Sequence, residues 1–541
     1  MKNATRVKVF ALIVLLSNYL SSQNVQFFWG KAFPLDHKGT NYLLGKTDKS
    51  LIGYKVSRKT VSTTKYSLKD LLLAGENPII GSKKSGSNVI DNDYTLNSFV
   101  ITKSNMFVSV TNYDRKADKN SIYMQQLDDA GKLSGKFTKV DEISATRKNN
   151  SGSFDIYTSD DSTKVLLVNN PPYERYSGEK FGFKIFDENL KEIKNLKIEL
   201  PYKDRYFSVE SYVLANDGTI FMLARINLSK KERKEKEKDE STYYYEIISI
   251  NTEGKGEVAE YEINLKGKFI EDVSFSYDED QKKIICAGFY GNLEKRTNGI
   301  NGIFFMRIDK ASKNVEATGF KELDKDFVAD LTSKRSAAKE KGISSLFNIK
   351  KFVRKSDGGA VLIAEYTYDY TVTTCTTDPK TGARSCTTTY HYVRNNILAI
   401  NIAQDGTIKW LTNIPKYQHT VNDGGAYNSF LFSTFNDKMY FIYNDNAANL
   451  DPTKVKTVKD IRTMSNPKKS TCVLVELNEG GEFSKKAIFN SKENKFILMP
   501  KFASRVGEHE YIVESISPGF YCCIIPFKKA LGRMARITFT N

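Results

Sequence analysis

Short, wholly apolar runs recur along the chain, and a tight polar turn comes before each of them. In SDGGAVLIAEY, which begins at Ser356, a turn is followed by five apolar residues and then a charged one. Related phrases are NDGTIFMLARI, DEDQKKIICAGFY, FNDKMYFIYND and GEHEYIVES. Apolar runs of this length between turns are typical of strands that are buried on both faces.

These runs are spaced at roughly 55 to 80 residues. They begin at Met106, Val165, Ile220, Ile284, Val361, Met439 and Glu510, and YLLG at Tyr42 resembles an eighth copy. Each run is followed by a strand–turn–strand phrase such as ILAINIAQDGTIKWLTNI, with Gly or Asn in the turn, where positive φ is needed. An extended segment such as YFSVESYVLA precedes each run. The repeating unit is therefore four antiparallel strands, which we name A to D in chain order.

A four-stranded antiparallel unit repeated this often predicts an all-β fold, a β-propeller of seven or eight blades. A single blade cannot bury both of its faces, so neighbouring blades must pack in a ring. The count is eight if the copy at Tyr42 forms a whole blade, and seven if residues 42–71 only complete the last sheet. Two unrelated β-sandwich domains are the alternative, but the A–D order persists over residues 23–541 without a linker, which favours one propeller domain.

Loop lengths predict where such a propeller would bind a ligand. The A–B and C–D turns are short, whereas the B–C and D–A connections, which would share the opposite face, are often long. The long connections are residues 169–180, 227–241, 291–301, 368–395 and 444–470, together with 71–93 and 324–346. The last of these predicts a short helical insertion. Long loops carry function disproportionately, so we expect the binding surface on this face.

Strand B ends in polar or aromatic residues where it reaches that face. They are Asn112, Tyr113, Asn170, Arg225, Tyr290, Glu365, Tyr366, Asn444, Asp445 and Glu514. Together they are candidates for a binding rim, although a strand that leaves the core also becomes polar for no functional reason.

The N-terminus predicts export. Lys2, Arg6 and Lys8 precede an apolar run at residues 9–16, and small residues follow near position 22. This pattern is typical of a secretory signal peptide over residues 1–22. An uncleaved anchor is the alternative, but the apolar core is short for a membrane span. No transmembrane span is expected after cleavage, so we expect a periplasmic, outer-membrane-associated or extracellular protein.

Cysteine and charge add little to this picture. Only six Cys occur in 541 residues, so the hydrophobic core holds the fold. Cys375 and Cys386 flank a DPKTG turn, and we predict a disulfide across this hairpin. The net charge of +17 is spread along the chain, and its densest run, KKERKEKEKDE from Lys230, mixes both signs as a solvated loop does. We do not expect nucleic acid as a partner.

Catalytic motifs are sparse. The four His show no metal-binding spacing, and no nucleophile elbow or phosphate-binding loop occurs. We therefore expect no cofactor and no metal. Glu365, Asp445 and Glu514 would form a glycosidase-like set only if they lay within about 10 Å of one another across a pocket.

The sequence also resembles a group of uncharacterised exported proteins from Bacteroidetes-type bacteria. The residues behind this resemblance are KSDGGAVLIAEY (355–366), TVNDGGAYNSF (420–430), DKMYFIYNDN (437–446) and SKRSAAKEKG (333–342). The resemblance implies no activity. We therefore predict an exported, non-catalytic propeller that binds a protein, an envelope component or a glycan. The alternative is a secreted glycan-active hydrolase or lyase with axial carboxylates.

Overall fold

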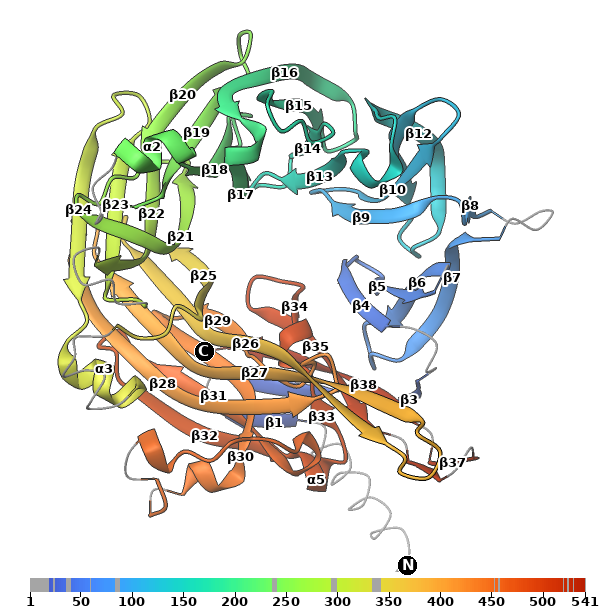
Figure 1. Cartoon of the computed structure of the whole chain (residues 1–541). Coiled ribbons are helices and arrows are strands. Elements are labelled where there is room, and N and C mark those ends of the chain that lie inside the picture. Colours follow the sequence, from blue (N-terminus) through green and yellow to red (C-terminus); the bar gives the residue numbers. More distant parts are fainter. Residues whose placement is uncertain are drawn as a thin grey trace, which may run out of the picture.

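The structure is a computed structural model. It describes residues 19–22, 25–35, 40–58, 60–82, 88–235, 241–292, 299–332, 342–451, 453–455, 458–518, 520–522, 525–528 and 530–540. Its sheets are arranged as a ring around a central axis (Figure 1). Residues 1–18 of the predicted signal peptide and most of residues 333–342 lie outside the described part.

Seven blades follow one another along the chain, each with four antiparallel strands in sequential order. Blade 1 contains β4 (Thr40–Lys46), β5 (Ser50–Ser57), β6 (Thr60–Ser67) and β7 (Leu73–Gly81), with the short β8 (Ile90–Asp91) beside β7; blade 2 contains β9 (Thr95–Ile101), β10 (Met106–Asp114), β11 (Lys119–Leu127) and β12 (Leu133–Ser144); blade 3 contains β13 (Ser153–Thr158), β14 (Lys164–Asn170), β15 (Gly178–Asp187) and β16 (Glu192–Lys203); blade 4 contains β17 (Phe207–Leu214), β18 (Ile220–Asn227), β19 (Tyr243–Asn251) and β20 (Glu257–Glu262); blade 5 contains β21 (Lys268–Asp278), β22 (Lys283–Asn292), β23 (Gly302–Asp309) and β24 (Val315–Glu322); blade 6 contains β25 (Phe347–Arg354), β26 (Ala360–Thr377), β27 (Arg384–Ile402) and β28 (Ile408–Val421); blade 7 contains β29 (Leu431–Phe435), β30 (Lys438–Asn446), β31 (Ser470–Leu477) and β32 (Phe483–Asn490).

Blade 8 joins the two ends of the chain. Its strands are β33 (Ile497–Leu498) and β34 (Ser504–Arg505), β35 (Glu510–Ser517), β38 (Leu531–Phe539), β2 (Val25–Trp29) and β1 (Tyr19–Ser22), and β3 (Phe33–Pro34) also pairs with β38. A two-stranded ribbon of β36 (Phe520–Cys522) and β37 (Ile525–Lys528) interrupts the chain before β38. Antiparallel pairing of β2 with β38 therefore closes the ring.

The described part of the chain is thus an eight-bladed β-propeller, which confirms the predicted fold class and decides the count. The copy at Tyr42 forms a whole blade, but its strand was assigned wrongly. Tyr42 lies on β4, a strand A, and the buried strand B is the next one, β5. The strand that completes the last sheet is β2, which the repeat pattern did not reveal.

Eight hydrophobic clusters hold the ring together, and each lies between two neighbouring blades. On β22, Ile284 and Cys286 pack toward blade 4, whereas Ile285 and Ala287 pack toward blade 6. Successive residues of a strand point to opposite faces, so a strand with neighbours on both faces is apolar throughout. Full burial of a large apolar side chain contributes about 1.5–3 kcal/mol.

The short turns are fixed by local side-chain hydrogen bonds. In the A–B turn of blade 4, the backbone N–H of Thr219 donates to Asp217 Oδ1 at 2.8 Å. Gly218 in the same turn has a φ of +94°, a conformation that favours glycine. The Asp–Gly pairs of the sequence therefore mark the face that carries the short turns.

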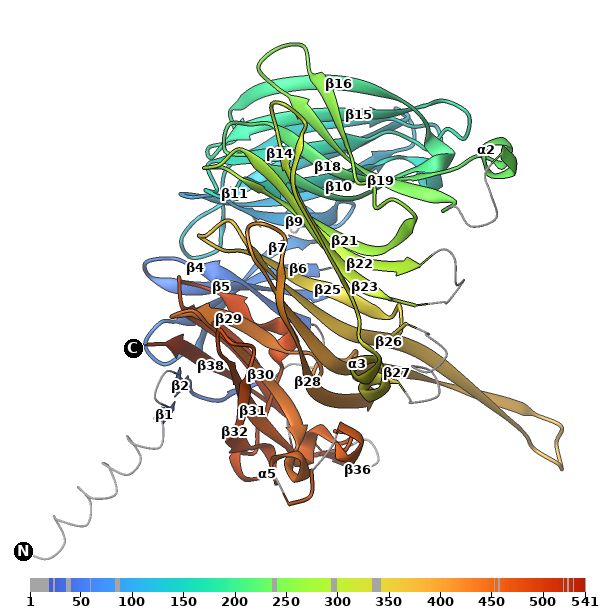
Figure 2. The same ribbon diagram turned by 90° about the vertical axis from the view of Figure 1, so that its left-hand side faces the viewer.

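The long B–C and D–A connections lie on the opposite face, which we call the long-loop face. Figure 2 shows α2 (Lys230–Glu235) and the end of the β26–β27 hairpin projecting from the same side of the ring. The predicted helical insertion is α3 (Lys325–Leu331), capped by the Asp324 side chain. The shorter helical segments are α5 (Ser491–Asn494), η1 (Lys148–Asn150), η2 (Asp204–Tyr206), η3 (Ala447–Leu450), η4 (Val458–Asp460), η5 (Pro467–Lys469) and η6 (Pro500–Phe502).

Two of the predicted long loops are largely strand. Residues 73–81 within the predicted 71–93 loop form β7, the outer strand of blade 1. Residues 368–395 form a regular extension of β26 and β27 and not an irregular loop. Alternating Thr, Tyr and Val residues favour strands, and this stretch is rich in them.

Candidate functional site

Three of the predicted rim residues lie inside the protein. Glu365, Asn444 and Asp445 are each 0% exposed, so they are not part of an open rim. The polar side chains at the ends of these B strands form hydrogen bonds and ion pairs between blades. This structural role explains their polarity.

Glu365 is one half of a fully buried ion pair. Its Oε1 accepts from Lys416 Nζ at 2.8 Å, and its Oε2 accepts from the Ser429 hydroxyl at 2.9 Å. The ammonium also donates to the carbonyl of Arg394 at 2.8 Å and to Gln418 Oε1 at 2.9 Å. All three ammonium protons therefore have an acceptor, although burial still lowers the pKa of Lys416.

Asn444 and Asp445 belong to the same region. The Asn444 carbonyl accepts from Gln418 Nε2 at 2.7 Å, which links it to the Glu365 pair. Asp445 Oδ2 lies 3.0 Å from Lys485 Nζ, and its Oδ1 accepts from Asn449 Nδ2 at 2.8 Å. This network joins blades 6 and 7 and stabilises their contact.

These contacts argue against the predicted carboxylate set. Two of its three members are already neutralised by lysines in buried ion pairs, so they are not free to act as acid and base on a substrate. The third, Glu514, is largely buried, and desolvation raises its pKa to about 7. The structure therefore gives no support to a glycosidase mechanism through Glu365, Asp445 and Glu514.

The other rim residues are spread over separate blades. Asn112, Tyr113, Asn170, Arg225 and Tyr366 are partly exposed, whereas Tyr290 is only 2% exposed. Their polar groups contact their own surroundings: Asn112 donates to the Asp93 carbonyl, and the Arg225 guanidinium lies 4.0 Å from the Tyr243 ring centre. Whether they act together as a binding rim stays a prediction.

A cleft of 1170 Å³ opens on the long-loop face between blades 3 and 4. It is lined by the B–C connection of blade 3, the D–A connection between the two blades, and the B–C connection of blade 4. Six cationic residues and one carboxylate line it: Arg175, Lys203, Arg205, Lys230, Lys231, Arg233 and Glu232. We call it the basic cleft.

Two short sequence phrases form one part of the lining of the basic cleft. An acidic residue, Arg and Tyr occur in this order at residues 174–176 and again at 204–206. Asp204 Oδ2 accepts from the backbone N–H of Glu174 at 2.6 Å, which joins the two phrases. The Arg205 guanidinium lies 5.2 Å from the Tyr176 ring centre and 4.3 Å from that of Tyr206. Cation–π contacts thus hold this arginine in place.

Another part of the lining is the first turn of α2, which begins with a capping box. The Ser229 N–H donates to Glu232 Oε2 at 2.6 Å, and the Glu232 N–H donates to the Ser229 hydroxyl at 3.3 Å. This contact draws the single carboxylate of the basic cleft into the helix terminus. The lysine and arginine side chains of the segment therefore dominate its electrostatics.

A carboxyl pair lies directly behind η2. Burial and the nearby Asp204 carboxylate raise the pKa of Glu179 to about 8. This raised pKa favours the protonated form of Glu179 beside Asp204.

The basic cleft was missed at the level of sequence because its residues come from three separate connections. The run from Lys230 was interpreted as a solvated loop of mixed charge, yet its first residues line the cleft. The repeated acidic–Arg–Tyr phrase was the available signal.

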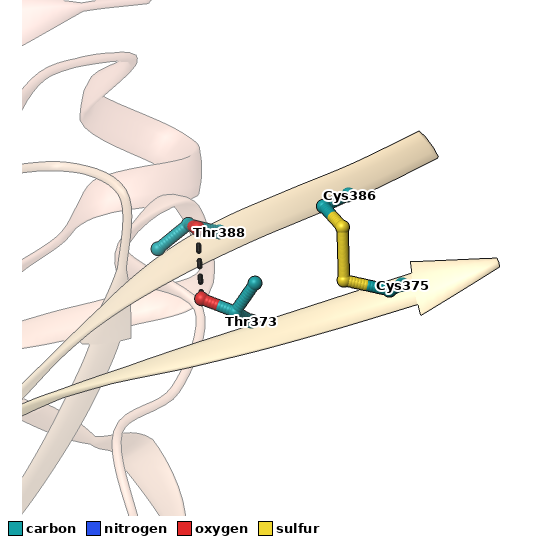
Figure 3. The surroundings of a disulfide bond; sticks show 4 residues. All are labelled: Thr373, Cys375, Cys386 and Thr388. Atoms are coloured by element: carbon teal, nitrogen blue, oxygen red, sulfur yellow. Dashed lines mark hydrogen bonds between the residues drawn. A yellow bond between two sulfur atoms is a disulfide. The ribbon is translucent and has the colours of Figure 1, made fainter. Parts of the chain in front are cut away.

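The predicted disulfide is present. Cys375 on β26 and Cys386 on β27 are directly opposed in the register, with their Cα atoms 4.1 Å apart. The neighbouring pair, Thr373 and Thr388, is hydrogen-bonded through the side chains at 2.9 Å (Figure 3). The two strands of the hairpin are therefore cross-linked close to its end.

The described residues show neither a membrane-spanning helix nor a cluster of metal ligands. None of the helices placed by the structure is long and apolar enough to cross a membrane. Within the same residues, no group of three or more His, Cys, Asp or Glu is arranged to hold a metal ion.

The arrangement of blades defines the class of protein, an eight-bladed β-propeller. No protein-family model matches the sequence, and no curated protein matches it. Similar solved structures include a prolyl endopeptidase with 8% identity and a TM-score of 0.39. The alignment covers 94% of this chain and 56% of the endopeptidase. The β-propeller domain of the Trilobed protease from Pyrococcus furiosus matches with 11% identity and a TM-score of 0.32, over 83% of this chain and 98% of the domain. The WD40 domain of SCAP from fission yeast matches with 9% identity and a TM-score of 0.36, over 95% and 98%. These TM-scores lie below 0.5, so none of these neighbours bears on function.

Proposed function

We propose that this protein is an exported, non-catalytic binding protein that holds a component of the cell envelope on its long-loop face. The observation that carries the proposal is the basic cleft. It is built from connections on that face and from the adjoining ends of β16, β18 and β19, and it holds a single carboxylate that caps a helix. Such a site offers charges and rings for binding but no acid–base pair for hydrolysis.

The disulfide supports export. Cross-strand disulfides persist in oxidising compartments outside the cytosol, and Cys375 and Cys386 form one in an exposed hairpin. The basic and apolar pattern of residues 1–22 and the resemblance to exported proteins of Bacteroidetes-type bacteria agree with this localisation.

Site-specific photocross-linking tests the proposal. A photoreactive residue is placed at Lys231, whose side chain is 87% exposed beside the basic cleft, or at Lys255, exposed in a C–D turn on the opposite face. Each protein is then irradiated with the native envelope fraction. We expect adducts from position 231 and few from position 255, with no shortening of envelope polysaccharides or peptides. Equal adducts from both positions, or consumption of an envelope component, would contradict the proposal.

A further inference from the structure

Within the residues that the structure describes, three of the six cations that line the basic cleft lack the acidic partners that surface cations usually have, whereas Lys231 pairs with Glu235 and Arg233 donates to the Leu228 carbonyl. Among the described residues, no carboxylate forms an ion pair with Arg175, Lys203 or Arg205. The Nε of Arg205 is buried and has no hydrogen-bond partner in the described part of the protein. No carboxylate that the structure describes therefore competes for this guanidinium, and because Arg205 lines the basic cleft, the guanidinium can bind an oxyanion of a ligand there.

The nearby carboxylates are held by other groups. Glu174 accepts from the Ser177 hydroxyl at 2.6 Å and lies 3.8 Å from Lys180. Asp204 accepts from the backbone N–H of Glu174, and its carboxylate is one of the causes that raise the pKa of Glu179. Positive charge is therefore concentrated in one concave region. The Tyr176 and Tyr206 rings also restrain the Arg205 guanidinium. A restrained guanidinium favours bidentate contacts with carboxylate or sulfate groups.

An aromatic ring lies beside these charges. Tyr173 lines the basic cleft and is 51% exposed. Its backbone is fixed, because its N–H donates to Asn150 Oδ1 at 2.8 Å and its carbonyl accepts from Asn150 Nδ2 at 3.1 Å. A positioned, exposed tyrosine suits the apolar face of a sugar ring, since one end of such a side chain is apolar and the other is polar.

We propose that the basic cleft binds an acidic polysaccharide. Arg175 and Arg205 contact its carboxylate or sulfate groups, and Tyr173 packs against a sugar ring. Nucleic acid has the same charge and also stacks on aromatic rings, but the disulfide agrees with the proposed export to an oxidising compartment, which favours a glycan. This inference rests on the proposed function and specifies its ligand.

Fluorescence anisotropy with four labelled probes of matched length tests the ligand class. The probes are an alginate oligomer for carboxylate, dextran sulfate for sulfate, neutral dextran, and single-stranded DNA. We expect the full chain to bind alginate or dextran sulfate and to bind neutral dextran at least tenfold more weakly, with affinity falling as salt rises. Whichever acidic probe binds more tightly identifies the anionic group. Tighter binding of DNA than of both acidic polysaccharides would overturn the proposal.

Matched variants locate the binding site. Arg205→Ala should weaken binding of the preferred acidic probe about tenfold, because a charge-assisted hydrogen bond is lost. Arg205→Lys should lie between Arg205→Ala and the wild type, since it keeps the charge but loses the guanidinium fork. Lys255→Ala removes the same charge on the opposite face and should leave affinity within about twofold. An equal loss in Lys255→Ala would mean non-specific attraction to the basic surface and would overturn the proposal.

The aromatic contact has its own control. Tyr173→Ala should weaken binding of the acidic polysaccharide severalfold, whereas Tyr173→Phe keeps the ring and should bind like the wild type. Circular dichroism of each variant confirms that it folds. If none of the four probes binds while position 231 still yields envelope adducts, the polysaccharide assignment fails and the binding function stands. If the adducts also disappear, both proposals fail.

Discussion

At the scale of single residues, the polar ends of the B strands stabilise the contacts between blades. The buried Lys416–Glu365 pair is the clearest case, since both side chains are 0% exposed. Lys416→Met would leave a carboxylate buried with the Ser429 hydroxyl as its remaining side-chain partner. Removing one member of a buried pair typically costs about 3–5 kcal/mol, so we expect this loss in the free energy of unfolding measured with urea.

Two further variants separate this effect from charge alone. Lys416→Met combined with Glu365→Gln should recover part of the loss, because no unpaired buried charge remains. Lys438→Met breaks a partly exposed ion pair with Glu476 and should cost less than about 1 kcal/mol. If Lys416→Met were no more destabilising than Lys438→Met, the buried network would not have the role that its geometry indicates.

Glu179 makes stability depend on pH. Burial and the Asp204 carboxylate raise its pKa from the ordinary 4.5 of a glutamate carboxyl to about 8 in the folded protein. Between these values the unfolded chain has lost the proton while the folded protein keeps it, so folding becomes less favourable as pH rises, and the penalty is constant above pH 8. Glu179→Gln removes this penalty. Its gain in Tm over the wild type should be small at pH 5 and largest at about pH 8.

Exposure of the Glu179 side chain to solvent limits the size of this gain in stability. Glu179 is partly exposed, so solvent screens its charge. We expect Glu179→Gln to raise the free energy of unfolding by on the order of 1 kcal/mol. Glu257→Gln removes the same charge from an exposed position on β20 and should leave the pH profile of the wild type unchanged. A Glu179→Gln gain that was independent of pH would show that Glu179 is ionised in the folded protein.

At the scale of elements, the outer part of the β26–β27 hairpin is an extension that does not contribute to the core. Residues 371–388 are all exposed, and β28 pairs with β27 only as far as His391. Replacing both Cys375 and Cys386 by Ser should therefore leave the global Tm unchanged and speed amide hydrogen exchange at residues 371–377 and 384–390. Thr373→Ala, which removes one neighbouring hydrogen bond, should produce a smaller effect. A clear fall in global Tm would contradict this view of the hairpin.

Strands, turns and the disulfide could be predicted from the sequence because their signals are local. Continuous apolar runs identify the B strands, Asp–Gly pairs identify the short turns, and the DPKTG turn places Cys375 opposite Cys386. The basic cleft could not be predicted in the same way, because Arg175 and Arg205 belong to different connections. Burial of Glu365 was also hidden, since its partner Lys416 lies 51 residues away on another strand.

At the scale of the whole molecule, closure of the ring depends on β2. Val25, Phe27 and Trp29 are at most 3% exposed and pack into the cluster between blades 7 and 8. Without β2, β38 would become an open edge, and edges of this kind promote aggregation. The two strands are separated by almost the entire sequence, so short-range patterns gave no sign of their pairing.

Two shortened chains test this closure. A chain that starts at Gln23 loses β1, which pairs only with β2 among the described strands, and should unfold in urea like the full chain. A chain that starts at Lys31 also loses β2 and its three buried apolar side chains. It should lose about 5–9 kcal/mol, because burial of each such side chain contributes about 1.5–3 kcal/mol, and should aggregate more readily. Equal stability of the two chains would mean that the other seven blades and the clusters between them hold the ring without β2.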